Sequence, residues 1–176
     1  MKTRIATVWL DGCSGCHMSL LDMDQRLLQL ADKIELVYSP LVDAKEFPEN
    51  VDVTLVEGSI SNEENLEEIR RIRQRTKLLV SLGDCAVTGN VPSMRNAFTV
   101  DQTLEPAYRA DQSKHTKVEF EEVPKLLKTV IPLHSAVKVD VFIPGCPPSA
   151  DIIHYAITEL LEGKIPDLNA LTRFGK

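Results

Sequence analysis

The sequence lacks the features of a membrane-spanning or exported chain. None of its apolar runs approaches the roughly 20 residues that a helix needs to cross a bilayer. The segment before Asp11, MKTRIATVWL, has too few apolar residues for the core of a signal peptide. We therefore expect a cytoplasmic protein. In that reducing compartment, cysteines act as metal ligands or reactive groups more often than they form disulfides.

Basic residues are scarce relative to acidic ones. The chain has 20 Lys and Arg against 26 Asp and Glu, which gives a net charge of −6 at pH 7. This balance argues against nucleic acid as the main partner, because phosphate binding requires a basic surface. The length of 176 residues suits one domain with its own hydrophobic core.

Five apolar segments have the composition of β-strands. Val, Ile and Leu dominate them without strict alternation, as in parallel strands that are covered on both faces. They are Thr3–Leu10, Ile34–Ser39, Asp52–Val56, Lys77–Leu82 and Val139–Ile143. Most of the segments that connect these predicted strands are long enough to contain a helix.

Three helical patterns lie between or after these segments. The second opens with the capping-box pattern Ser61-x-x-Glu64, and the third has Ser149 as a candidate N-cap and Gly163 as a stop. Alternating strands and helices imply right-handed βαβ units, and hence an α/β fold with a flavodoxin-like, doubly wound parallel sheet of about five strands. The apolar positions, at helical spacing, are Leu20, Met23, Leu27 and Leu30, then Leu66, Ile69 and Ile72, then Ile153, Ala156, Ile157, Leu160 and Leu161.

The four cysteines are far apart in the sequence but follow predicted strands. Cys13 and Cys16 come after the first strand, Cys85 after the fourth and Cys146 after the fifth. In an open parallel sheet, the loops at the carboxyl ends of the strands share one edge and line the ligand crevice. The sequence therefore predicts that all four thiols gather at the C-terminal edge. These loops also contain glycines, whose backbone can approach a cofactor closely: Gly12, Gly15, Gly83 and Gly145.

Several kinds of site could use these cysteines. Four thiolates suit zinc or an iron–sulfur cluster, but zinc ribbons usually supply two close Cys-x2-Cys pairs, and this chain has one. Ligands on distant loops favour a cluster, most simply [4Fe–4S]. A thioredoxin-like couple would use only Cys13 and Cys16, and four unrelated buried cysteines are the simplest alternative. An FMN-binding module is disfavoured, because flavodoxin-type phosphate loops are rich in Ser and Thr and the first loop reads DGCSGC.

Three segments around the cysteines resemble those of a known family. GCSGCHMS, GDCAVTGNVPSMRN and PGCPPS are similar to the cluster-binding segments of nickel–iron hydrogenase small subunits, and to those of the homologous cluster-bearing subunit of respiratory complex I. The resemblance covers essentially the whole chain. Complex I subunits carry two adjacent cysteines in the first motif, whereas here Cys13-x-x-Cys16 is followed by Ser19, which is the hydrogenase form.

The resemblance also indicates which class of hydrogenase small subunit this chain is similar to. Periplasmic and membrane-linked small subunits have a twin-arginine signal and a C-terminal extension for two more clusters, and neither is visible in this sequence. We therefore expect a relative of the small subunit of soluble, bidirectional NAD-reducing enzymes. A complex I-type subunit and a cofactor-F420- or ferredoxin-linked hydrogenase subunit are the alternatives.

The family resemblance implies a cofactor, a reaction and partners. Cys13, Cys16, Cys85 and Cys146 would hold one [4Fe–4S] cluster, proximal to a Ni–Fe site on a separate large subunit. The chain would pass electrons between that site and an NAD-linked diaphorase module, whose own subunits carry FMN and further clusters (H2 + NAD+ = NADH + H+). We expect no FMN in this chain.

One segment fits the strand and helix pattern poorly. The region 89–120 is polar and contains two prolines, and long loops without secondary structure are usually functional or supported by something else. It is either a surface insertion with a short helix or an arm ordered by a partner subunit. We accordingly expect a single iron–sulfur domain over 1–176, with this irregular, partner-contacting insertion.

Five further residues are candidates for roles near the thiols. Glu57 should end the third strand at the same edge, where the resemblance implies a position near the cluster and a possible proton relay. The alternative is an acid at a helix N-terminus near Ser59 and Ser61. Asp11 and Asp84 would either lower the cluster potential or cap adjacent turns. His17 would either bond to the site or lie exposed in a turn. Trp9 would lie at the partner interface or in the core.

Overall fold

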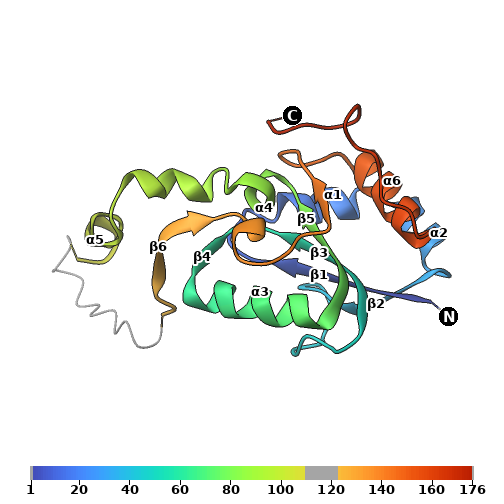
Figure 1. Ribbon diagram of the computed structural model, residues 1–176, viewed down its shortest axis with the longest axis horizontal. Coiled ribbons are helices and arrows are strands. Elements are labelled where there is room, and N and C mark those ends of the chain that lie inside the picture. Colours follow the sequence, from blue (N-terminus) through green and yellow to red (C-terminus); the bar gives the residue numbers. More distant parts are fainter. Residues whose placement is uncertain (1, 110–122, 176) are drawn as a thin grey trace.

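The computed structural model describes residues 2–109 and 123–175, and its main sheet has five parallel strands in the order β2-β1-β3-β5-β7 (Figure 1). This is the predicted flavodoxin-like arrangement, in which the chain order of the strands reverses at one point in the sheet. The strands agree with the five predicted segments to within two residues at each end: β1 (Thr3–Trp9), β2 (Ile34–Tyr38), β3 (Val51–Glu57), β5 (Thr76–Leu82) and β7 (Val141–Ile143).

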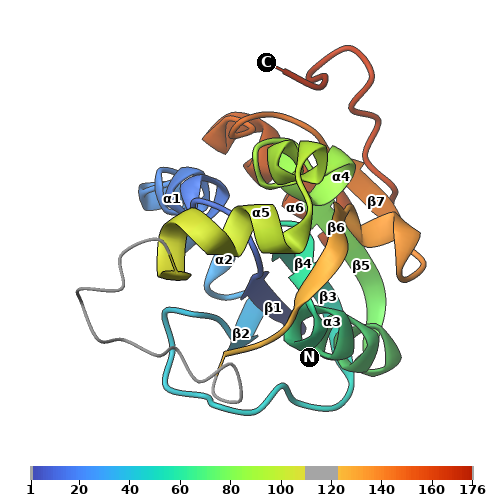
Figure 2. The same ribbon diagram turned by 90° about the vertical axis from the view of Figure 1, so that its left-hand side faces the viewer.

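Helices cover both faces of this sheet (Figures 1 and 2). On one face, the core contains strand residues such as Leu55 and Val80 packed against the region of the first two helices and against the last helix. On the other face, residues such as Val56 and Leu79 pack against the long middle helix. The helices are α1 (Gly15–Leu21), α2 (Gln25–Leu30) and α6 (Ala150–Leu161) on the first face, and α3 (Glu63–Arg75) on the second.

The first predicted helix is wrong as a single element. Leu20 lies in α1, Leu27 and Leu30 lie in α2, and Met23 lies in the turn between the two helices. The helix is divided because Asp24 in this turn has a φ of 50°. A positive φ interrupts a right-handed helix. The break still leaves Met23 and Leu30 buried in the same core layer, so the apolar spacing identified core residues although it joined two elements.

The predicted start of the second helix is off by one residue. The N-cap of α3 is Asn62, whose Oδ1 accepts a hydrogen bond from the Asn65 backbone N–H at 2.8 Å. Ser61 lies one residue too early to cap the helix, and its hydroxyl instead donates to Asn65 Oδ1 at 3.3 Å. Both Ser61 and Asn62 belong to a short strand, β4 (Ile60–Asn62), which pairs antiparallel with β6 (Leu126–Ile131). Sequence analysis did not identify this two-stranded sheet.

The predicted ends of the third helix are confirmed. The side chain of Ser149 accepts a hydrogen bond from the Ile152 backbone N–H at 3.4 Å, and α6 ends just before Gly163, which has a φ of 74°. Glycine adopts this left-handed conformation without the steric cost of a Cβ atom. The helix therefore begins directly after the loop that carries Cys146.

The described part of the insertion is a series of short helical turns. These are η1 (Pro92–Ala97), α5 (Val100–Leu104) and η2 (Glu105–Arg109), while residues 110–122 lie outside the described residues. Asn96 fastens the first turn to β6 with two hydrogen bonds to Val130, at 2.7 and 2.9 Å. Contact of the insertion with a partner stays a prediction. No helix among the described residues is long and apolar enough to cross a membrane.

Candidate metal centre

The four cysteines follow three strands at the C-terminal edge of the sheet, as predicted, although two of them lie in the first turns of helices and not in loops. Cys13 and Cys16 lie where β1 gives way to α1, and Cys85 lies in α4 (Asp84–Thr88), directly after β5. Cys146 follows β7. All four thiols are free; Cys13 and Cys146 are exposed, Cys85 is half-buried and Cys16 is buried. The group of thiols therefore reaches from the core to the surface.

The pKa values of the two less exposed thiols, Cys16 and Cys85, are raised. Burial raises the pKa of the Cys16 thiol, and the Glu57 carboxylate and the three other cysteines raise it further. Burial also raises the pKa of the Cys85 thiol, with contributions from Cys146 and Cys13. The pKa values of Cys16 and Cys85 are thus both raised by other cysteines of this group. A bound metal cation would reverse the shift, because it stabilises the thiolate form that coordinates it.

The backbone beside Cys16 is shaped around its sulfur. Gly83, between β5 and α4, has a φ of 82°, and a Cβ atom there would lie 2.2 Å from the Cys16 Sγ. The Gly83 N–H also donates to the Ile143 carbonyl at 2.8 Å, which fixes the loop against the end of β7. Any residue with a Cβ atom would therefore displace the sulfur from this position. A soft, all-thiol donor set with backbone close behind it suits an iron–sulfur cluster.

The Cys146 loop is held from two sides. From α1, the Ser19 hydroxyl donates to the Pro148 carbonyl at 2.6 Å, and from the segment after α4, the Asn90 side-chain N–H lies 3.5 Å from the Cys146 Sγ. The second contact offers a donor to the sulfur itself. Among the described residues, no three Cys, His, Asp or Glu side chains form a group that could hold a metal ion. The assignment of the four cysteines as ligands therefore stays a prediction.

Glu57 ends β3 at this edge, as expected. It is 2% exposed, and its Oε2 accepts a hydrogen bond from the His17 backbone N–H at 2.9 Å and lies 2.6 Å from His17 Nδ1. Glu57 therefore binds the first turn of α1, and not a helix start near Ser59 and Ser61. The expectation of an exposed His17 is wrong, because the carboxylate gives the buried imidazole a partner.

The other three candidate residues are Asp84, Asp11 and Trp9. Asp84 is buried and its two oxygens accept backbone N–H groups from Gly145 and Gly175, which is the turn-capping role. Asp11 is half-buried and forms an antiparallel bridge with Ser59 through its backbone. Trp9 is 48% exposed, so its core alternative is wrong.

Three of these contacts could not be predicted from the sequence. The bonds of Glu57 to His17, of Ser19 to Pro148 and of Asp84 to the C-terminal segment join residues between 40 and 129 positions apart. The sequence showed only that His17, Ser19 and Asp84 lie close to cysteines along the chain. It did not show which residues would be their hydrogen-bond partners.

Comparisons with known proteins identify the family of this chain. The model of the family "NADH ubiquinone oxidoreductase, 20 Kd subunit" matches residues 13–160. The chain is 42% identical over 172 residues to the delta subunit of the NAD-reducing hydrogenase HoxS of Cupriavidus necator, covering 95% of this chain and 82% of that one. It is 39% identical to a subunit of the vhu F420-non-reducing hydrogenase of Methanocaldococcus jannaschii, but covers only 59% of that chain.

A solved structure shows the same fold over nearly all of the chain. A chain of an NAD+-reducing [NiFe]-hydrogenase in the H2-reduced state matches with a TM-score of 0.91 and 40% identity, covering 99% of each chain. A [NiFeSe]-hydrogenase chain from Desulfomicrobium baculatum matches with a TM-score of 0.62 at 19% identity, which shows a shared fold. Because the family model matches most of the chain, this chain belongs to the NADH ubiquinone oxidoreductase 20 kDa subunit family, and it is similar to the delta subunit of the NAD-reducing hydrogenase HoxS.

Proposed function

We propose that this chain is the electron-transfer small subunit of a cytoplasmic NAD-reducing [NiFe]-hydrogenase. Its four cysteines, Cys13, Cys16, Cys85 and Cys146, would hold one [4Fe–4S] cluster, which supplies one-electron transfer when bound. The main support is the gathering of four free thiols from three distant segments at one sheet edge. The 42% identity to a subunit of an NAD-reducing hydrogenase identifies the chemistry that such a site serves.

The chain's own residues would hold and insulate the cofactor. Cys16 binds from the buried side, while Cys13 and Cys146 bind at the surface, where a partner can approach. Burial and N–H donors near the sulfurs tune the reduction potential of such a site. The Asn90 side chain beside the Cys146 Sγ and the Val91 backbone N–H beside the Cys85 thiol are donors that could serve this purpose.

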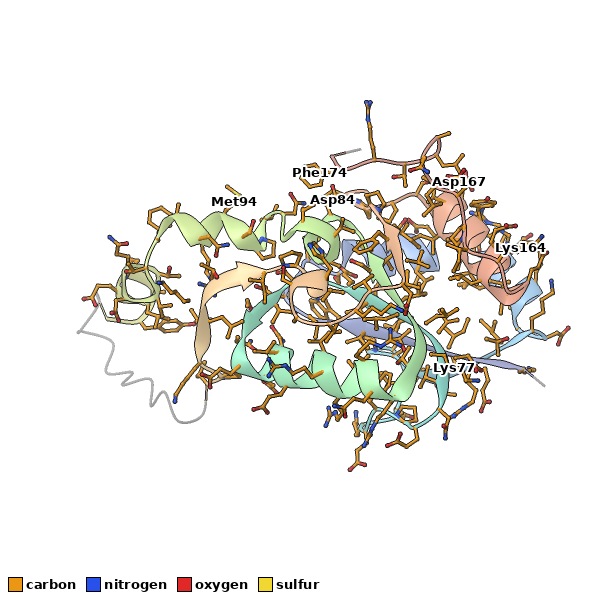
Figure 3. All side chains as sticks on the ribbon, in the orientation of Figure 1. Lys77, Asp84, Met94, Lys164, Asp167 and Phe174 are labelled. Carbon is orange, nitrogen blue, oxygen red and sulfur yellow. The ribbon has the colours of Figure 1, made fainter. Side chains whose placement is uncertain are left out.

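The partner we propose is a large subunit with a Ni–Fe centre, where hydrogen is cleaved. Large apolar side chains are exposed on segments next to the cysteine loops, and Met94 in η1, 71% exposed, is the most prominent of them (Figure 3). Exposed apolar groups of this kind are typical of surfaces that another subunit covers. The others are Trp9, Met18, Val91 and Phe98.

Electrons would continue to a diaphorase module with FMN and further clusters on its own subunits, and then to NAD. The similarity to the delta subunit of HoxS, an NAD-reducing hydrogenase, favours NAD as the acceptor. Several relatives of 37–40% identity are subunits of F420-non-reducing hydrogenases, which makes a different acceptor the second candidate. The test is whether the purified complex reduces NAD with hydrogen. NAD reduction would support NAD as the acceptor, and its absence would favour a different acceptor.

Glu57 is our candidate for a proton relay near the large-subunit interface. It is buried at the edge that carries the cysteines, and its carboxylate lies 2.6 Å from an imidazole nitrogen that can exchange a proton with it. Such short contacts between a carboxylate and an imidazole are common in proton-transfer sites. The residue would act beside the electron path and would not bind the cofactor.

The deciding experiment is a metal analysis of anaerobically purified protein, co-expressed with its large subunit. We expect about four irons and four acid-labile sulfides per chain, with little zinc and a broad brown absorbance. Serine at any of the four cysteines should lower the iron content, whereas Thr158→Val, within α6, should not. Stoichiometric zinc without sulfide, or yellow fluorescent flavin, would overturn the proposal.

A further inference from the structure

The C-terminal segment, residues 164–175, folds back from α6 onto the cysteine edge. Figure 1 shows this segment in red, returning across the top of the molecule to lie above α4. Leu168 is buried in the core layer that contains α6, the Thr172 hydroxyl donates to the Pro144 carbonyl at 2.6 Å, and the Gly175 N–H donates to Asp84 Oδ2 at 2.8 Å. Phe174 lies beside Asp84 in Figure 3. The segment is therefore anchored at three points.

Asp84 connects this segment to two of the cysteine loops. Its Oδ1 accepts a hydrogen bond from the Gly145 N–H at 2.7 Å, and its own N–H donates to the Gly145 carbonyl at 2.9 Å. Asp84 directly precedes Cys85, and Gly145 directly precedes Cys146. The pair of reciprocal bonds thus sets the distance between two cysteine-bearing turns. Both carboxylate oxygens are engaged by backbone N–H groups, and the residue is 2% exposed.

The Cys146 loop depends on such bonds because regular structure supports it weakly. The preceding strand, β7, has only three residues and pairs with β5 alone. The loop itself runs through Pro144, Pro147 and Pro148, which have no backbone N–H to donate. Its position is therefore determined by groups that reach it from outside: Ser19, Asn90, Asp84 and Thr172.

We propose that residues 164–175 form a latch that holds the Cys146 loop against the Cys85 turn, through Thr172 and Asp84, and thereby sets how firmly the metal centre is retained. This inference rests on the proposed function, since it takes Cys85 and Cys146 as ligands. Thr172 and Asp84 are positioning residues that act through the backbone of the loop. Releasing the latch lets the loop move away from the other thiols, so the fourth ligand detaches more often.

The test compares hydroxyl variants in the intact anaerobic complex. Thr172→Val removes the bond to Pro144 at nearly constant volume, and Thr172→Ser keeps it. Thr158→Val is the matched control, because its hydroxyl bonds only to the His154 carbonyl within α6, at 2.9 Å. Asp84→Asn replaces one acceptor oxygen with an N–H2 group that cannot accept a backbone N–H.

Three measurements report on these variants. Iron release to a ferrous chelator should be about tenfold faster in Thr172→Val and Asp84→Asn, since one hydrogen bond to a buried loop is worth about that factor. Thr172→Ser and Thr158→Val should match the wild type. Hydrogen exchange of the Gly145 amide should accelerate in the same two variants, and the electron paramagnetic resonance signal of the reduced protein should broaden.

The outcomes separate this inference from the proposed function. If the wild type contains iron and sulfide, but Thr172→Val retains wild-type rates of iron release and of Gly145 exchange, the latch is wrong. If the wild type contains neither, the proposed function is wrong, and Gly145 exchange still tests whether the segment holds the loop. If Asp84→Asn does not fold, the pair Thr172→Val and Thr172→Ser decides.

Discussion

The carboxylate of Glu57 binds both the backbone and the side chain of His17, with Oε2 2.9 Å from the backbone N and 2.6 Å from Nδ1. The two residues are 40 positions apart, at the end of β3 and in the first turn of α1. Because Cys16 directly precedes His17, this bond fixes the orientation of the turn that carries two of the four cysteines. His17 Nε2 is buried without a hydrogen-bond partner among the described residues.

Substitution of Glu57 should separate structure from proton transfer. Glu57→Ala leaves two buried donors of His17 unpaired, so we expect the free energy of unfolding in urea to fall by about 1–3 kcal/mol. Glu57→Gln keeps an acceptor for the backbone N–H and should lose less. It should nevertheless slow proton-coupled turnover at unchanged iron content. Glu67→Gln, exposed on α3, is the control, and unchanged turnover in Glu57→Gln would remove the relay role.

A methyl group at Gly83 should expel the sulfur of Cys16. The Cβ of Gly83→Ala would lie 2.2 Å from the Cys16 Sγ, so the thiol or the loop must move and iron content should drop sharply. Gly163→Ala is the control, because Gly163 has a similar φ of 74° but no atom within 4 Å of the added Cβ. That variant should lose only the left-handed backbone cost, about 1–2 kcal/mol of stability. Equal iron content in both variants would contradict the prediction.

Removal of the Ser19 hydroxyl should loosen α1 from the Cys146 loop. Ser19→Ala leaves the carbonyl of the buried Pro148 without this donor, which costs about 1–3 kcal/mol. Thermal unfolding monitored by circular dichroism should report a lower midpoint. Ser135→Ala, at an exposed position, provides the comparison. A midpoint equal to that of Ser135→Ala would mean that the 2.6 Å contact contributes nothing.

The Asp140 carboxylate should make stability depend on pH in the acid range. Burial by itself would raise the pKa of Asp140, but hydrogen bonds from the Leu79 backbone N–H and from Arg73 and Lys138 hold it below its usual value. A lowered pKa in the folded state means that the unfolded chain binds the proton more tightly, so stability is lost as pH falls through the folded pKa.

The measurement for Asp140 is unfolding free energy against pH, in wild type and in Asp140→Asn. At pH 7, we expect the wild type to be more stable by about 1–3 kcal/mol, and this difference should shrink below about pH 4. Asp32→Asn, at an exposed position, should show no such dependence. A difference that stays constant down to about pH 3 would show that the charge of Asp140 does not contribute.

Much of the sheet could be predicted because strand formation depends largely on the residues within each segment. Val, Ile and Leu runs such as the one around Val53 form strands that are covered on both faces, and their alternation with helical patterns determines a parallel sheet. The helix boundaries were less predictable. The positive φ of Asp24 and the extended backbone of Ser61 depend on packing and on pairing with β6, which the local sequence does not encode.

The order of strands and cysteines along the chain was enough to predict that the four cysteines lie at one edge of a parallel sheet, and the family resemblance of the residues around them was confirmed. The polar groups that hold the cysteine-bearing segments could be identified only from the folded structure. Glu57 accepts a hydrogen bond from His17, and Ser19 donates one to Pro148. Asp84 accepts hydrogen bonds from Gly145 and Gly175, and each of these four bonds joins residues at least 40 positions apart in the sequence. Hydrogen-bond partners are a matter of distance and direction, and these exist only once the chain has folded.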